Sequence, residues 1–181
     1  MATYIALLRG INVGGKTSLP MKELVGLLEQ LGCEKVRTYI QSGNVVLESS
    51  EKAPSLAGKV KAAIEKQRGF KPEILLLSKK ELAKAIANNP FPQAEDDPKA
   101  VHFGFLATKP LKPNLEKLEG LKKESEEFQL IGQVFYLYAP EGVGRSKLAA
   151  ASEKALGVVL TDRNWNTVCK LQAMLNEEPR A

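Results

Sequence analysis

The sequence of 181 residues has few of the side chains on which common catalytic and metal sites depend. It contains one histidine, two cysteines and one tryptophan, and 6% of its residues are aromatic. A single histidine excludes metal sites built on paired histidines. Two cysteines cannot form a disulfide framework, which favours a reducing compartment. We therefore predict a protein with neither a metal nor a cofactor.

Long hydrophobic runs are also absent. No apolar stretch approaches the roughly 18 residues that a membrane helix needs. The N-terminal apolar run has no basic stretch before it and is interrupted by Arg9, so a signal peptide is not expected. Hydrophobic and charged fractions of 44% and 26% are ordinary for a globular protein. The composition predicts a soluble cytoplasmic protein with no membrane partner and leaves its oligomeric state open.

Strand and helix patterns occur in the same order twice. Strands are predicted at Thr3–Leu8, Val36–Ile40, Val45–Leu47 and Glu73–Leu77, with helices starting at Pro20, near Pro54 and after a Ser78–Glu81 capping box. After a proline-rich stretch, strands follow at Val101–Leu106, Glu127–Ile131, Val134–Tyr138 and Val158–Thr161, with helices starting at Pro113, Ser146 and Asn164. Each half therefore has the order βαββαβ with a trailing helix.

Glycine spacing supports an internal duplication. Gly43 and Gly132 are 89 residues apart, and Gly69 and Gly157 are 88 apart; chance alternation of strands and helices is the other explanation. We predict an α+β fold of two tandem ferredoxin-like repeats, packed as one pseudo-symmetric body. The repeats span residues 1–88 and 99–181, and residues 89–98 are the linker.

Five strings together resemble the bacterial family called domain of unknown function 1697. They are Tyr4–Lys16, Thr38–Val46, Asn89–Phe91, Gly144–Leu148 and Thr161–Val168. The resemblance implies two ferredoxin-like repeats in a cytosolic protein, but no activity, substrate or cofactor. It also implies that polar, glycine and tryptophan residues of these strings define the family, namely Arg9, Asn12, Gly14, Gly15, Gln41, Ser42, Asn44, Arg145, Ser146, Lys147, Arg163, Asn164, Trp165, Asn166 and Thr167.

The loop after the first strand matches a phosphate-binding pattern. Residues 10–17 fit GxxxxGK[ST], in which loop amides hold phosphates and Lys16 reaches the terminal ones. A P-loop lysine begins a helix, however, and Pro20 four residues later would disturb the first turns of that helix. A weaker hypothesis is that Arg9, Gly14, Gly15 and Lys16 hold an anion. A long turn that needs glycine is the structural explanation.

A second anion site is predicted at the start of the Ser146 helix. Ser146 is a good cap, free N–H groups carry partial positive charge there, and Arg145 and Lys147 add two cations. A simple capped helix start is the other explanation. Further candidates are Arg163, Asn164 and Asn166 near the last helix, and Gln41, Ser42 and Asn44 at the first hairpin tip.

Net positive charge is concentrated in one segment. The chain carries +5 overall, and residues 51–90 contain nine basic and four acidic groups. These basic residues lie on predicted helices, whereas ferredoxin-like modules read RNA bases with aromatics on the sheet. A solvated face is therefore favoured, although sequence-independent contact with phosphates stays open.

We predict from these features a binding protein for a small ligand that bears phosphate or carboxylate. The cations named above would neutralise its charge, and the amides and hydroxyls would supply directed hydrogen bonds. Two alternatives remain: a sequence-independent nucleic-acid binder through the basic helices, and an enzyme acting on a phosphorylated substrate. The enzyme hypothesis lacks a convincing general base.

Overall fold

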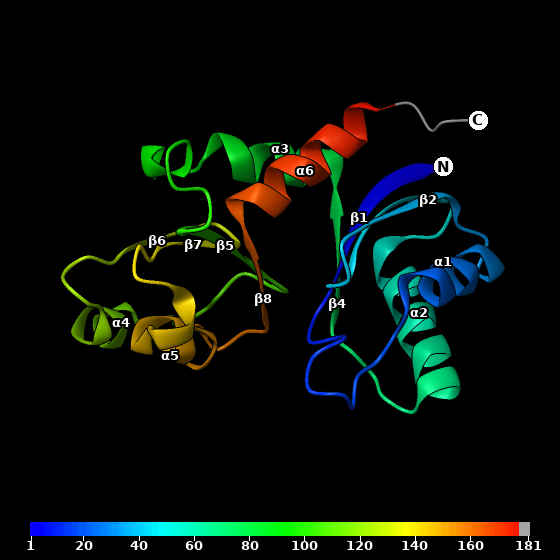
Figure 1. Cartoon of the computed structure of the whole chain (residues 1–181), viewed down its shortest axis with the longest axis horizontal. Helices are drawn as coiled ribbons and strands as arrows, with labels where there is room; N and C mark the ends of the chain where they lie inside the picture. The colour runs from blue at the N-terminus through cyan, green and yellow to red at the C-terminus, as the bar shows by residue number, and fades with distance from the viewer. Residues whose placement is uncertain (178–181) are drawn as a thin grey trace. The chain divides into compact units, whose positions relative to one another are not determined.

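The computed structural model describes residues 1–177 and contains the predicted order of elements twice (Figure 1). The first series is β1 (Ala2–Leu8), α1 (Met21–Gln30), β2 (Glu34–Tyr39), β3 (Asn44–Ser49), α2 (Ala53–Arg68), β4 (Ile74–Ser78) and α3 (Lys79–Ala87). The second is η1 (Pro92–Ala94), β5 (Val101–Leu106), α4 (Leu115–Leu121), β6 (Glu127–Ile131), β7 (Val134–Tyr138), η2 (Val143–Arg145), α5 (Lys147–Leu156), β8 (Leu160–Asn164) and α6 (Trp165–Asn176).

Each series forms a four-stranded antiparallel sheet with the ferredoxin-like strand order. The orders are β2-β3-β1-β4 and β6-β7-β5-β8, so the first strand of each series pairs with the third and the fourth. This pairing confirms the predicted α+β fold class with two ferredoxin-like halves.

The chain divides into two compact units that share its trailing helices. Among the described residues, one unit holds 1–84 and 170–177, and the other holds 85–169. Helix α3 thus begins in the first unit and ends in the second, and α6 does the reverse. The predicted linker lies within the second unit, where Phe91 and Ala94 are buried and the Phe91 ring packs 6.1 Å from that of Tyr138.

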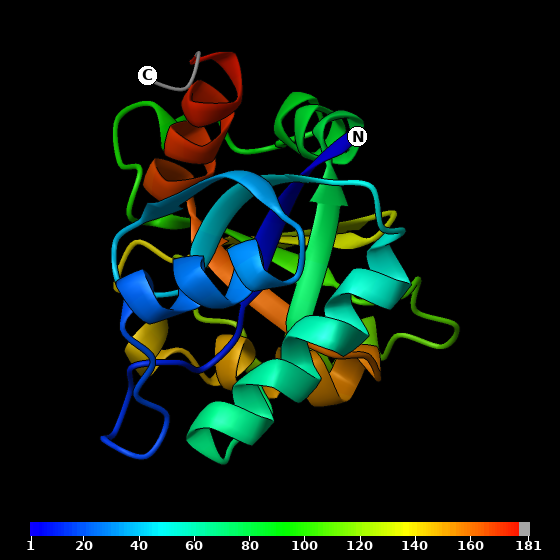
Figure 2. The same ribbon diagram turned by 90° about the vertical axis from the view of Figure 1, so that its right-hand side faces the viewer.

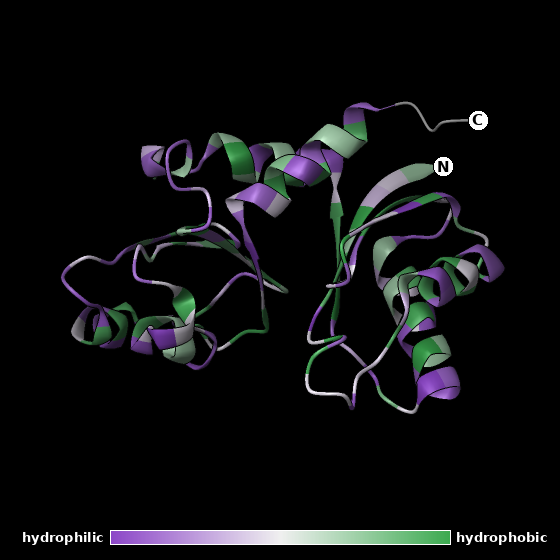
Figure 3. Cartoon of the chain, viewed as in Figure 1, coloured by the Kyte–Doolittle hydropathy of each residue, from purple (hydrophilic) through white to green (hydrophobic). Residues whose placement is uncertain are grey.

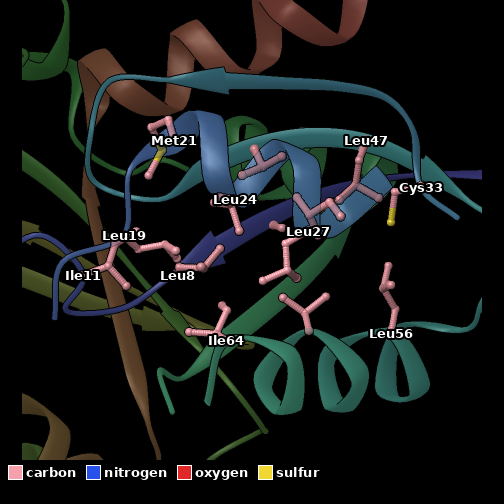
Figure 4. Packing of buried hydrophobic residues seen from close by; sticks show 14 residues of the cluster. Leu8, Ile11, Leu19, Met21, Leu24, Leu27, Cys33, Leu47, Leu56 and Ile64 are labelled. Carbon is pink, nitrogen blue, oxygen red and sulfur yellow. The ribbon is translucent and has the colours of Figure 1, made fainter. Parts of the chain in front are cut away.

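Helices α1 and α2 cover one face of the first sheet (Figure 2). Apolar residues of α1 and α2 meet Leu8, Val45 and Leu47 of the strands in one buried cluster (Figure 4). The carboxyl end of α2, in purple, is hydrophilic (Figure 3). Burial of the apolar faces of α1 and α2 against the sheet gives the first unit its core.

The second sheet is buried on both faces. Leu106, Phe135 and Leu137 pack against α4 and α5 on one face. On the other face, the Tyr136 hydroxyl donates a 2.6 Å hydrogen bond to the Ala85 carbonyl of α3, and Trp165 of α6 packs 5.6 Å from Phe103. Burial raises the pKa of Tyr136 to about 12, so this hydroxyl keeps its proton and remains a donor.

Of the two glycine pairs used as evidence for a duplication, one joins equivalent positions in the two halves and the other does not. Gly69 and Gly157 both end a helix in the left-handed conformation, with φ of 78° and 74°. In the hairpins, however, Leu8 N–H binds the Gly43 carbonyl whereas Leu106 N–H binds that of Gln133. Gly43 therefore corresponds to Gln133, and its 89-residue spacing from Gly132 does not join equivalent positions.

Gly43 provides a test of this packing. Its φ is 81°, and a Cβ there would lie 2.7 Å from the Leu8 Cβ. We expect Gly43→Ala to lower the free energy of unfolding by about 2–4 kcal/mol, since a left-handed alanine and an overpacked contact both cost energy. Gly132→Ala is the matched control, because its φ is 58° but the space around it is open. It should cost only about 1 kcal/mol in urea unfolding; equal losses would contradict the packing argument.

Candidate functional site

The glycine loop between β1 and α1 is anchored by Asn12. Its side-chain amide donates to the carbonyls of Leu19 at 2.9 Å and Gln41 at 2.7 Å, and its Oδ1 accepts from Leu19 N–H at 2.7 Å. These bonds tie the loop to the tip of the β2–β3 hairpin. The structure thus brings together two predicted site segments, and gives Asn12 a structural role.

The hairpin tip is held by a buried amide. Asn44 is fully buried and donates to the Tyr39 carbonyl at 3.2 Å and to the Ser42 hydroxyl at 2.9 Å. Gln41 is exposed beside it. Asn44 and Ser42 therefore define the turn, and their predicted contact with a ligand stays a prediction.

The P-loop interpretation conflicts with the position of the first helix. Lys16 and the neighbouring Gly14 and Gly15 are exposed in the loop, and α1 begins only at Met21 after Pro20 as its N-cap. A P-loop lysine reaches phosphates from the start of the helix that follows it. Arg9 and Lys16 remain exposed cations at this end of the first unit.

The start of α5 has the predicted cap. The Ser146 hydroxyl accepts a 3.0 Å hydrogen bond from Ala149 N–H, and Ser146 is buried. The preceding η2 turn contains Gly144 and Arg145. Both Arg145 and Lys147 are exposed on either side of the cap, so two cations flank the positive end of the helix.

Asn164, at the junction of β8 and α6, caps the last helix as predicted. Asn164 accepts from Thr167 N–H at 3.1 Å, while Asn166 is exposed. Arg163 donates from Nη1 to the Asp162 carbonyl at 2.8 Å. Burial lowers the pKa of Arg163 to about 10 against the opposing effect of Asp162, so the guanidinium stays charged at neutral pH.

A contact between His102 of β5 and Asp162 of β8 was not predicted from the sequence. The His102 Nδ1 lies 2.7 Å from Asp162 Oδ2, and its Nε2 lies 3.0 Å from the Lys99 carbonyl oxygen. The register of β5 and β8 explains this contact. His102 pairs with Asn164 and Gly104 pairs with Asp162, so His102 and Asp162 are diagonal neighbours on one face of the sheet. Both partners of the ring are acceptors, so the pair fits an imidazolium beside a carboxylate.

The Asp162 side chain also lines a pocket of about 280 Å³ in the second unit, which we call the α5 pocket. Its apolar wall comes from the sheet and the η2 turn, with Phe135, Leu137, Val143 and Leu160. Small residues of η2 and α5, namely Gly144, Ala149 and Ala150, also line the pocket. Two hydroxyls, Ser146 and Ser152, and the Asp162 carboxylate supply its polar groups. Among the predicted site residues, Ser146 lines this pocket.

Comparison with known proteins shows the family of the chain. The model of the protein family of unknown function DUF1697 matches residues 1–136. The chain belongs to this family. A solved structure of the conserved bacterial protein SP0830 from Streptococcus pneumoniae is similar over 96% of this chain and 98% of that one, with 25% identity and a TM-score of 0.71. No curated protein matches the chain.

Membership of DUF1697 leaves the site to be argued from its chemistry. Two of the resembling strings, Gly144–Leu148 and Thr161–Val168, lie beyond the matched residues. Within residues 1–177, no three histidine, cysteine or acidic side chains gather as metal ligands. No helix in that part of the chain is long and apolar enough to cross a membrane.

The His102–Asp162 pair makes stability dependent on pH. Burial alone would lower the pKa of His102, but the hydrogen bonds and charge of Asp162, with the Lys99 carbonyl, raise it above the ordinary value of 6.5. The charged pair therefore stabilises the fold fully below about pH 6.5, and this contribution is lost as pH rises through the folded-state pKa.

NMR titration of the ring protons of His102 should measure this shift directly, since the chain has one histidine. We expect a pKa above 6.5 in the wild type and a lower one in Asp162→Asn, where burial dominates. A wild-type value at or below 6.5 would contradict the charged pair.

Proposed function

We propose that this DUF1697 protein binds a small organic ligand in the α5 pocket. The observation that carries the proposal is the pocket itself, which combines an apolar wall with a few polar groups. Ligand sites are typically concave and mostly apolar, with a small number of placed polar groups that orient the ligand. A volume of about 280 Å³ limits the occupant to a small molecule.

The start of α5 supports an anionic group on that ligand. Gly144 and Ser146 line the pocket at the positive end of the helix, and Arg145 and Lys147 flank them as exposed cations. A carboxylate or phosphate near Ser146 would receive hydrogen bonds and opposite charge from this segment. The anionic ligand predicted from the sequence is thus proposed at this second-unit segment.

The nucleic-acid alternative is weakened by ion pairs on the basic helices. Of the nine basic residues in the segment 51–90, four lie beside carboxylates: Lys59 with Glu51, Lys61 with Glu73, Arg68 with Glu23 and Lys71 with Glu65. These partners reduce the charge available to a phosphate backbone.

His102 does not supply the enzyme alternative with a general base. Both ring nitrogens of His102 are engaged, with Asp162 and with the Lys99 carbonyl. The imidazole therefore has no nitrogen left to take a proton from a substrate or from the Ser146 hydroxyl. We propose binding rather than catalysis.

Blocking the pocket mouth tests the proposal. Ala150 is exposed on α5 and lines the pocket, so Ala150→Leu should fill the mouth without disturbing the core. The probe is 4-methylpentanoate, with 4-methylpentan-1-ol as its uncharged analogue, followed by amide chemical shifts in NMR. We expect the carboxylate to bind more tightly than the alcohol, and Ala150→Leu to weaken its binding by about tenfold or more through steric overlap.

Lys154→Leu is the matched control, because residue 154 is exposed one turn further along α5 and does not line the pocket. It should leave binding unchanged. Equal binding by wild type and Ala150→Leu, or shifts confined to residues remote from the pocket, would refute the proposed function.

A further inference from the structure

Asp162 gives the α5 pocket a second kind of polar group. Its side chain is 44% exposed, whereas that of His102 behind it is 9% exposed. A carboxylate can accept about four hydrogen bonds, and His102 takes one of them at Oδ2. The carboxylate therefore has acceptor capacity for a donor that enters the pocket.

The hydrogen bonds of His102 hold this carboxylate in place. The Lys99 carbonyl fixes one ring nitrogen and Asp162 accepts from the other, so the ring cannot turn without losing a bond. The imidazolium also offsets the negative charge of Asp162. A bound anion near Ser146 therefore does not face an uncompensated carboxylate across the same pocket.

Two other charged groups lie close to this pair. Arg163 follows Asp162 on β8 and binds its backbone carbonyl. On α5, Glu153 accepts from Leu160 N–H at 3.0 Å. Each is engaged with the β8 backbone, and neither lines the pocket. Asp162 is thus the acidic group that a ligand in the α5 pocket would meet.

We infer that the ligand of the α5 pocket is a small zwitterion with an apolar side chain, whose protonated amine binds Asp162. This inference rests on the proposed function and extends it. The apolar wall of Phe135, Leu137 and Leu160 takes the side chain, the start of α5 takes the anionic group, and Asp162 takes the amine. Together these three features match the chemistry of a hydrophobic amino acid or a close analogue.

Three probes with related apolar chains separate the contributions. L-Leucine carries both charged groups, 4-methylpentanoate lacks the amine, and 3-methylbutylamine lacks the carboxylate. On the wild-type protein at pH 6.5, we expect L-leucine to bind about tenfold more tightly than either single-charge probe, because charge-assisted hydrogen bonds are stronger than neutral ones. Asp162→Asn should abolish the advantage of L-leucine over 4-methylpentanoate.

The pKa of His102 can be measured in the wild-type protein, so this second test needs no variant. An ammonium beside Asp162 competes with the imidazolium for the same carboxylate, so saturating L-leucine or 3-methylbutylamine should lower the pKa of His102. Saturating 4-methylpentanoate should leave that pKa unchanged or raise it.

The outcomes separate the inference from the function on which it rests. If 4-methylpentanoate binds in the pocket but L-leucine binds no more tightly and the pKa of His102 does not fall, the zwitterion is refuted and the binding function stands. If none of the three probes shifts the pocket residues, both are refuted.

Discussion

The pairing of β8 with β5 is the constraint on which the α5 pocket depends. This register puts Asp162 opposite Gly104 and one diagonal step from His102, within 2.7 Å of its ring. Gly104 also lets Leu160 approach the sheet, since a Cβ at that position would lie 2.9 Å from the Leu160 Cδ1. A shift of one residue would turn Asp162 and Leu160 to the other face and remove both the polar end and part of the apolar wall.

Much of the fold could be predicted because it depends on local patterns. Pro20, Ser146 and Asn164 cap the helices that the sequence predicts to begin there. Ser78 forms the expected capping box with Glu81, with bonds of 2.6 and 3.1 Å. Caps and turns depend on residues that are neighbours in the sequence, so they can be predicted from the sequence alone.

The last strand shows where such local reasoning ends. The apolar run predicted a strand at Val158–Thr161, but β8 extends over Leu160–Asn164. Asp162, Arg163 and Asn164 have no strand pattern of their own, and they become a strand because β5 supplies their hydrogen-bond partners. The His102–Asp162 pair follows from that long-range pairing, and it was therefore invisible while each residue was considered alone.

The candidate site changed for the same reason. Asn12 and Asn44 looked like ligand-binding amides. In the structure, Asn12 joins the glycine loop to the hairpin tip through the Gln41 carbonyl, and Asn44 holds the tip itself through the Tyr39 carbonyl and the Ser42 hydroxyl. Ser146 was predicted as a cap beside two cations, and it is one, but its nearness to Asp162 required the fold. The polar groups that matter to the proposal therefore come from different elements, α5 and β8, which the fold brings to one pocket.

A crystal structure of the protein grown with a high concentration of L-leucine would test the central claim most directly. We expect the amino acid in the α5 pocket, with its amine at hydrogen-bond distance from Asp162 and its carboxylate at the start of α5 near Ser146. An empty pocket, or a ligand whose amine points away from Asp162, would contradict it.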